Sequence, residues 1–243
     1  MSREFEIARE VDLPAAPEDV WTAITADTAA WQFPTGMEIP TGAAPPEGGP
    51  VTTWDPPHRL VIRMKSPDGT FNALDYTIEA RDGGTAHLRY VHSGILADEW
   101  EDQYDAIGGH TDFYFHTLGQ YLEHFNGRPI TYVGQPSSGI EGPEAAGAPD
   151  AMDTLRAALG VSPDARVGDE VHASVGGAGT LDGVIDYSTP EFLGVRASDG
   201  LYRFFGRNHY GGVVGMSAHV FVDGLDAAAS EAALKAWLDG VYA

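Results

Sequence analysis

The fold of this chain is decided by residues 97–126, which read ADEWEDQYDAIGGHTDFYFHTLGQYLEHFN. Mostly apolar side chains recur here at spacings of three and four, so they fall on one side of an α-helix about 40 Å long. Asn126-Gly127 is a typical helix end. Gly108-Gly109 lies mid-helix, where each glycine costs about 1 kcal/mol relative to alanine, which indicates a kink or a close approach by a strand or ligand. The apolar side consists of Trp100, Tyr104, Ile107, Thr111, Phe115, Leu118, Leu122 and Phe125.

Three strand patterns precede this helix. Apolar and polar residues alternate along 59–65, 72–79 and 86–92, the period expected of strands with one buried face. Turn sequences at 66–69 and 82–84 separate them, which predicts an antiparallel meander. Upstream, alternation over 4–13 predicts another strand. Pro17-Glu18-Asp19 opens a predicted helix, since proline and acids favour the first helical turn.

The second half of the chain repeats a pattern of the first. Residues 57–63 read PHRLVIR and residues 190–196 read PEFLGVR, and each copy is followed by a matched Tyr-x4-Arg, at Tyr76 and at Tyr202. Two repeated motifs in the same order predict two related units, of which the second is shorter. Further strands are expected over 167–175, 180–187, 191–197, 200–207 and 212–222, with helices over 150–159 and 226–238.

These patterns predict two domains joined by a linker. The first covers 1–127, and the second, a degenerate copy of it, covers 150–243. Residues 128–149 are rich in Gly, Pro and Ser, which favours a linker. Ile130 to Val133 could supply the first strand of the second unit.

Four segments of the first half carry a family resemblance: EDVWTAI at 18–24, WDPP at 54–57 with the strand after it, the strand end at 85–94, and YLE at 121–123. They resemble the START-like superfamily, in particular the branch of the activator of heat-shock protein 90 ATPase homologues. The resemblance implies an α+β helix-grip fold, a curved antiparallel sheet wrapped around a long C-terminal helix with a cavity between them. A second, smaller α+β unit would follow. The additional chaperone-contacting domain of the family's founder has no counterpart here.

Charge and composition exclude several function classes. Lys and Arg number 14 against 36 Asp and Glu, so the formal charge is −22. Such a field repels phosphate backbones and anionic membranes, and the sequence contains no cluster of basic residues, so we expect neither nucleic acid nor membrane as a partner. Cysteine is absent, which removes disulfides, thiol nucleophiles and Cys-type zinc sites. No stretch reads as a signal peptide or membrane span, so we expect a cytoplasmic protein.

The inward faces of the predicted sheet and helix form a candidate ligand cavity. Their composition is mostly apolar with a few polar groups, as in small-molecule sites, although the same residues could form a packed core. The candidate ligand-binding residues are Trp31, Phe33, Trp54, Met64, Tyr76, Tyr90, His92, Trp100, Tyr104, Ile107, Thr111 and Phe115.

His92 is the best acid-base candidate, with Tyr76 as its partner. An imidazole has an ordinary pKa of about 6.5 and can exchange a proton near neutral pH, but a hydrogen-bonded histidine at a strand end is the plainer interpretation. No metal is expected, because His110, His116 and His124 do not share one helix face and His87 points away from His92. Gly-x-Ser-x-Gly is absent, and the glycine-rich stretches at 176–179 and 206–212 indicate hairpin turns, so no cofactor is expected either.

Three functions remain open. The first is a carrier or sensor that binds an apolar or aromatic small molecule between sheet and helix without turnover. The second is a START-like cyclase, aromatase or hydrolase acting on a polyketide-like substrate through His92 and Tyr76. The third is a module that contacts a chaperone. A homodimer is compatible with each, and whether there is turnover is left open.

Overall fold

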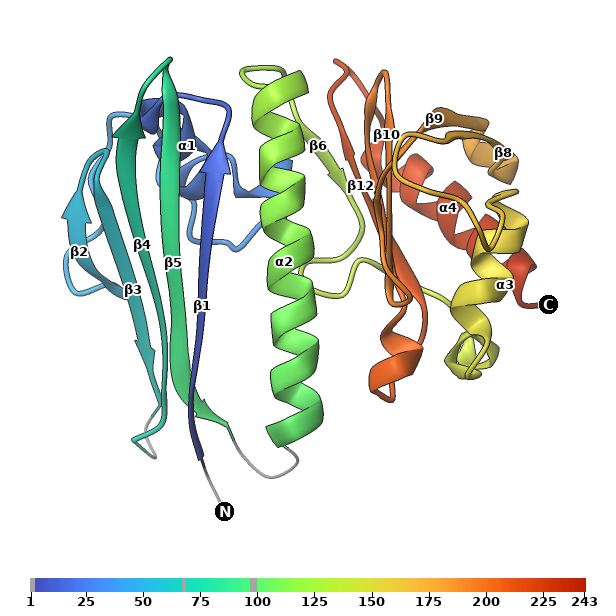
Figure 1. The fold of residues 1–243 in the computed structure, drawn as a ribbon, viewed down its shortest axis with the longest axis horizontal. Coiled ribbons are helices and arrows are strands. Elements are labelled where there is room, and N and C mark those ends of the chain that lie inside the picture. Colours follow the sequence, from blue (N-terminus) through green and yellow to red (C-terminus); the bar gives the residue numbers. More distant parts are fainter. Residues whose placement is uncertain (1–2, 67–68, 97–99) are drawn as a thin grey trace. The chain divides into compact units, whose positions relative to one another are not determined.

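The computed structural model describes residues 3–66, 69–96 and 100–243, and the chain in it divides into two compact units. The first consists of residues 1–31 and 36–126, and the second of 32–35 and 127–243. Both are α+β, and each is built on one antiparallel sheet (Figure 1).

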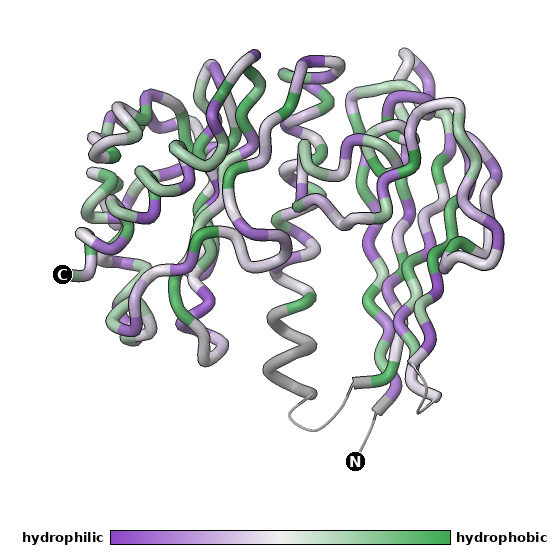
Figure 2. The backbone as a smooth tube through the Cα atoms, turned by 180° about the vertical axis from the view of Figure 1, so that it is seen from behind, coloured by the Kyte–Doolittle hydropathy of each residue, from purple (hydrophilic) through white to green (hydrophobic). Residues whose placement is uncertain are grey.

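The first unit contains a five-stranded sheet in the order β1-β5-β4-β3-β2. Alternating residues give the strands one buried face, and Figure 2 shows hydrophobic and hydrophilic segments alternating along them. The expected strands and long helix are confirmed. The elements are β1 (Arg3–Leu13), α1 (Pro17–Thr25), the 3₁₀ turn η1 (Thr28–Ala30), β2 (Val51–Asp55), β3 (Arg59–Lys65), β4 (Phe71–Arg81), β5 (Thr85–Leu96) and α2 (Trp100–His124).

Helix α2 runs alongside β1 (Figure 1). Arg9 of β1 forms a bidentate ion pair with Asp112 of α2, with 3.1 Å between Nη2 and Oδ2. A Cβ atom at Gly108 would lie 3.5 Å from the same Arg9 Nη2. The expected close approach at Gly108-Gly109 is therefore a strand side chain resting on the helix backbone.

The second unit contains a seven-stranded sheet in the order β6-β12-β11-β10-β9-β8, with β7 also paired to β12. Its α-helices and longer strands lie where the sequence predicts them, whereas β7 and η2 fall in the segment expected to be a linker. The elements are β6 (Thr131–Val133), β7 (Ile140–Glu141), η2 (Glu144–Gly147), α3 (Ala151–Ala158), β8 (Glu170–Ser174), η3 (Gly176–Ala178), β9 (Thr180–Ser188), β10 (Phe192–Ala197), β11 (Gly200–Phe205), η4 (Arg207–Tyr210), β12 (Gly215–Val220) and α4 (Ala227–Val241).

Helices α3 and α4 cover one face of this sheet (Figure 1). Met152 and Leu155 of α3 and Leu234 and Leu238 of α4 are buried in one apolar cluster with strand residues such as Val195. This cluster is the core of the second unit. No helix in the described part of the chain is both long and apolar enough to cross a membrane.

Candidate functional site

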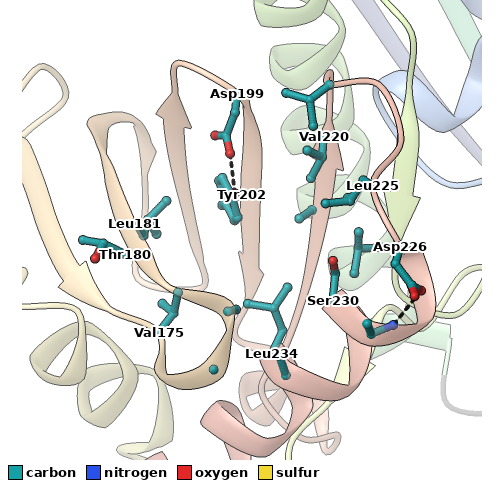
Figure 3. Close-up of a pocket in the computed structure, with 17 residues that line it drawn as sticks. Val175, Thr180, Leu181, Asp199, Tyr202, Val220, Leu225, Asp226, Ser230 and Leu234 are labelled. Carbon is teal, nitrogen blue, oxygen red and sulfur yellow. Dashed lines mark hydrogen bonds between the residues drawn. The ribbon is translucent and has the colours of Figure 1, made fainter.

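A pocket of about 380 Å³ lies in the second unit between the sheet and α4 (Figure 3). Its walls come from β6, β9, β11 and β12 on the sheet side, and from η3 and α4 on the other side. Most of the lining residues are apolar, but polar groups contribute nearly as much of the wall surface as apolar groups do. The larger apolar side chains that line it are Val133, Val175, Leu181, Val220, Val222, Leu225 and Leu234.

The pocket exists because the side chains that face it from α4 are small. Ala229, Ser230 and Ala233 lie on the pocket side of the helix, and only Leu234 beside them is large. Spacings of three and four put these positions on one face. Turn η3 closes one side, since a Cβ atom at Gly177 would lie 3.7 Å from the Cβ of Ala233. Because these alanine and serine side chains are short, they leave the space between α4 and the sheet unfilled.

Asp199 and Tyr202 place polar groups at the sheet side of the pocket. Asp199 lies in the tight turn between β10 and β11, where its carbonyl oxygen accepts a hydrogen bond from the Phe221 amide at 2.7 Å. The Tyr202 hydroxyl donates to Asp199 Oδ2 at 3.3 Å (Figure 3). Burial raises the pKa of Tyr202, and the nearby Asp199 carboxylate raises it further. The phenol therefore stays protonated at neutral pH and directs its proton at Asp199.

Asp226 marks the start of α4 at the other side of the pocket. Its Oδ1 accepts a hydrogen bond from the Ala229 amide at 3.0 Å, the usual role of an aspartate at a helix N-cap. The contact fixes where the helix begins and, with it, which side chains face the sheet. Asp226 is exposed, whereas Asp199 is half-buried.

In the first unit the structure brings four of the predicted aromatic residues together. The rings of Tyr76 and Tyr90 lie 4.9 Å apart, Tyr90 lies 4.9 Å from Phe115, and Phe115 stacks on Trp31 at 5.9 Å. All four side chains are buried. The hydroxyls of Tyr76 and Tyr90 are hydrogen-bonded to each other, and burial raises the pKa of both phenols. These residues form one cluster on the inward face of the sheet, as the alternation predicts.

His92 borders this cluster, with its ring 6.2 Å from that of Tyr90. Nε2 lies 2.6 Å from Asn72 Oδ1, and the ring meets Phe5 edge-on at 4.9 Å. Since an amide oxygen only accepts, Nε2 carries the proton. Burial lowers the pKa of His92 to about 4, so the ring is neutral at pH 7. The side chain is half-buried and shares the inward face of β5 with Leu88 and Tyr90.

The other predicted site residues lie in several places. Trp54 packs on Trp21 at 4.8 Å between ring centres. Met64 is half-buried on β3, and Phe33 belongs to residues 32–35, which group with the second unit. The buried Thr111 hydroxyl donates to the Ile107 carbonyl at 2.7 Å, a bond within the helix. The side chains of Trp100 and Tyr104 lie outside the described part of the structure.

No group of three or more His, Asp or Glu side chains among the described residues could hold a metal ion. His172 pairs with Asp182 and His87 with Asp12, and the second of these contacts measures 2.8 Å. Such pairs are ordinary surface contacts, and each offers too few ligands for a metal.

Sequence reasoning missed the pocket of the second unit. The signal that could have found it is the internal repeat, which equates Tyr202 with Tyr76, already a candidate in the first unit. The run DAAASEAALKAWL at 226–238 is the second signal, because it places small residues along one face of a helix.

No protein-family model matches this chain, and no curated protein matches it. Among solved structures, DynU16 of the dynemicin biosynthetic locus covers 98% of this chain and 95% of its own, with 14% identity and a TM-score of 0.38. Protein MLL2253 from Mesorhizobium loti covers 50% of this chain and 98% of its own, with 20% identity and a TM-score of 0.40. CalU16 from Micromonospora echinospora covers 50% of this chain and 86% of its own, with 17% identity and a TM-score of 0.34. At these identities and TM-scores the likenesses carry no information about activity.

Proposed function

We propose that this protein is a carrier or sensor that binds a small apolar or aromatic molecule between a sheet and a helix, and that each unit is a helix-grip domain. The pocket of about 380 Å³ against α4 is the observation that carries the proposal. Its volume suits a molecule of two or three fused or linked rings, and its walls combine aliphatic side chains with a few polar groups. The aromatic cluster around Tyr76 and Tyr90 stays a predicted second site in the first unit.

Two observations favour binding over the alternatives. An enzyme that used His92 as a base would gain from a carboxylate on the ring, whereas the partner here is the amide of Asn72. A chaperone-contacting module would need an exposed apolar patch, and among the described residues only Met37 and Val167 are exposed large hydrophobic side chains. Neither of these two functions has comparable support.

The neutral fluorophore N-phenyl-1-naphthylamine tests the proposal, because its emission rises when it leaves water for an apolar site. Ala229 lines the pocket at an exposed position of α4, so Ala229→Phe can place a ring in the pocket without disturbing the core. We expect this change to weaken probe binding about tenfold or more, or about 1.4 kcal/mol. Ala228→Phe is the matched control, since Ala228 is exposed and is not among the described pocket-lining residues.

Equal binding by both variants would mean that the probe does not occupy this pocket. In that case Tyr104→Trp distinguishes the remaining outcomes, because the sequence places Tyr104 at the predicted cavity of the first unit. Weaker binding in Tyr104→Trp would move the site to the first unit. No probe binding by the unmodified protein would overturn the proposed function.

A further inference from the structure

The charged groups of the α4 pocket all have one sign. Among the described residues that line it, the charged side chains are Asp199 and Asp226, and no Arg, Lys or His joins them (Figure 3). An anionic ligand would therefore meet two carboxylates and no countercharge.

Asp199 and Tyr202 together offer a ligand hydrogen-bond acceptors and no donor. The Tyr202 O–H is used by Asp199, so the Tyr202 oxygen offers a ligand only lone pairs. The Asp199 carboxylate accepts only, and it retains lone pairs beyond the one that Tyr202 uses. Hydroxyls that can donate are supplied elsewhere in the pocket, by Thr180 at the start of β9 and by Ser230 on α4. A ligand group that contacts Asp199 and Tyr202 must bring its own donor.

The two carboxylates are not equivalent. Asp226 is exposed and holds the start of α4 through the Ala229 amide. Asp199 is half-buried, and its position is fixed by the tight β10–β11 turn and by Tyr202. Charge interactions strengthen as water is excluded, so Asp199 is the better partner for a ligand charge.

We propose that the ligand of this pocket is a cationic amphiphile, with an apolar ring system against α4 and a protonated amine on the Asp199 carboxylate. This inference rests on the proposed function and adds the chemical class of the ligand. Tyr202 is a positioning residue, because it holds the carboxylate in place through its hydroxyl.

The net charge of −22 offers a competing explanation, since any cation is drawn to such a protein. A local contact and a general field differ in two ways. The general field responds equally to the loss of any one carboxylate and is screened by salt. The local contact depends on Asp199 and persists at high salt.

Three probes with one shape separate these cases: 2-naphthylmethylamine, 2-naphthylmethanol and 2-naphthoate, each titrated by calorimetry in 0.15 M and 0.5 M NaCl. We expect the amine to bind about tenfold more tightly than the alcohol at both salt concentrations, because one charged hydrogen bond contributes a free energy of about this size. The carboxylate should bind more weakly than either. Asp199→Asn should bring the amine down to the affinity of the alcohol. Asp182→Asn is the control, because it removes the same charge from β9 outside the described lining residues.

Each result decides one question. Equal binding of amine and alcohol would overturn the cationic ligand and leave the proposed function standing. If Asp182→Asn also removes the preference for the amine, or if 0.5 M NaCl removes it, the preference comes from the net charge of the protein. Either result would overturn the inference. A preference lost in Asp226→Asn but kept in Asp199→Asn would overturn the role of Asp199. If none of the three probes binds, the proposed function itself fails.

Discussion

His92 shows how burial alone can define the chemistry of one side chain. Its ring is held by Asn72 and Phe5, with no carboxylate among these neighbours, and burial lowers its pKa to about 4. A histidine in the unfolded chain has a pKa of about 6.5. Between these values the unfolded state binds a proton that the folded state does not bind. The stability contributed by neutral His92 is therefore complete above about pH 6.5 and is lost as the pH falls toward 4.

We expect the NMR titration of the His92 ring to have its midpoint near pH 4. Because His92 is partly open to water, the loss of stability between pH 6.5 and 4 should be only about 1–2 kcal/mol. In His92→Gln, the free energy of unfolding measured in urea should depend less on pH across this range. A midpoint near 6.5 would show that the site is wetter than its neighbours suggest.

At the scale of elements, a buried ion pair links three strands of the second sheet. Arg203 of β11 makes two hydrogen bonds of 2.8 Å to Asp186 of β9, and both side chains are almost fully buried. They meet over Gly194 of β10, where a Cβ atom would collide with both partners. The glycine therefore lets the pair form across the middle strand.

Removing one partner should cost far more than removing both. We expect Arg203→Met to lower the free energy of unfolding by about 3–5 kcal/mol, because Asp186 keeps a buried charge without its guanidinium. Arg203→Met combined with Asp186→Leu should recover most of this loss. Chemical unfolding of Arg203→Met, Asp186→Leu and the double variant measures the coupling energy between the two side chains. Additive effects would mean that the pair does not act as a unit.

Elements with a strict local period were predictable from the sequence. The alternation over 59–65 and the spacing of three and four over 97–126 are local, and they reappear as β3 and α2. Strand β2 was not predicted, because it has only five residues and its pairing with β3 is interrupted by a bulge. Pairing that depends on a neighbour leaves little trace in a short sequence.

Composition was a poorer guide than period. Residues 128–149 were expected to be a linker because they are rich in Gly, Pro and Ser, yet besides the anticipated strand β6 they contain β7 and η2. A Cβ atom at Gly139 would collide with the Met216 carbonyl, so this glycine serves a close strand approach. The pocket escaped prediction for a related reason. The volume of a pocket depends on the side chains of several segments together, so no single segment of the sequence predicts it.

At the scale of the whole molecule, the two sheets have corresponding strand orders. The order β1-β5-β4-β3-β2 of the first corresponds to β6-β12-β11-β10-β9 of the second, and β8 extends the second sheet beyond it. Leu60 pairs with Tyr76, whereas Leu193 pairs with Phe204, two residues beyond Tyr202. A shift of two keeps every side chain on its face. The internal repeat stays a prediction, and superposition of residues 190–240 on 57–126 tests it.

The charge of the whole chain should control its stability. A formal charge of −22 on 243 residues means that folding gathers carboxylates that repel one another. Surface ion pairs such as Arg59 with Asp75 offset little of this, because exposed pairs contribute about 0–1 kcal/mol each. Raising NaCl from about 0.02 to 0.5 M shortens the Debye length to a few ångströms and screens the repulsion. We therefore expect the melting temperature to rise by about 3–8 °C, which corresponds to about 1–3 kcal/mol for a chain of this size.

Differential scanning calorimetry in NaCl and in KCl measures the effect, and the two salts should act alike if screening is the cause. A variant with three exposed acids neutralised, Glu47→Gln, Asp164→Asn and Asp223→Asn, should begin with a higher melting temperature and respond less to salt. A melting temperature that falls with salt in the unmodified protein would instead mean that its ion pairs outweigh its repulsion. Such a result would be unexpected with 36 acidic residues against 14 basic ones, because most carboxylates then have no cation to pair with.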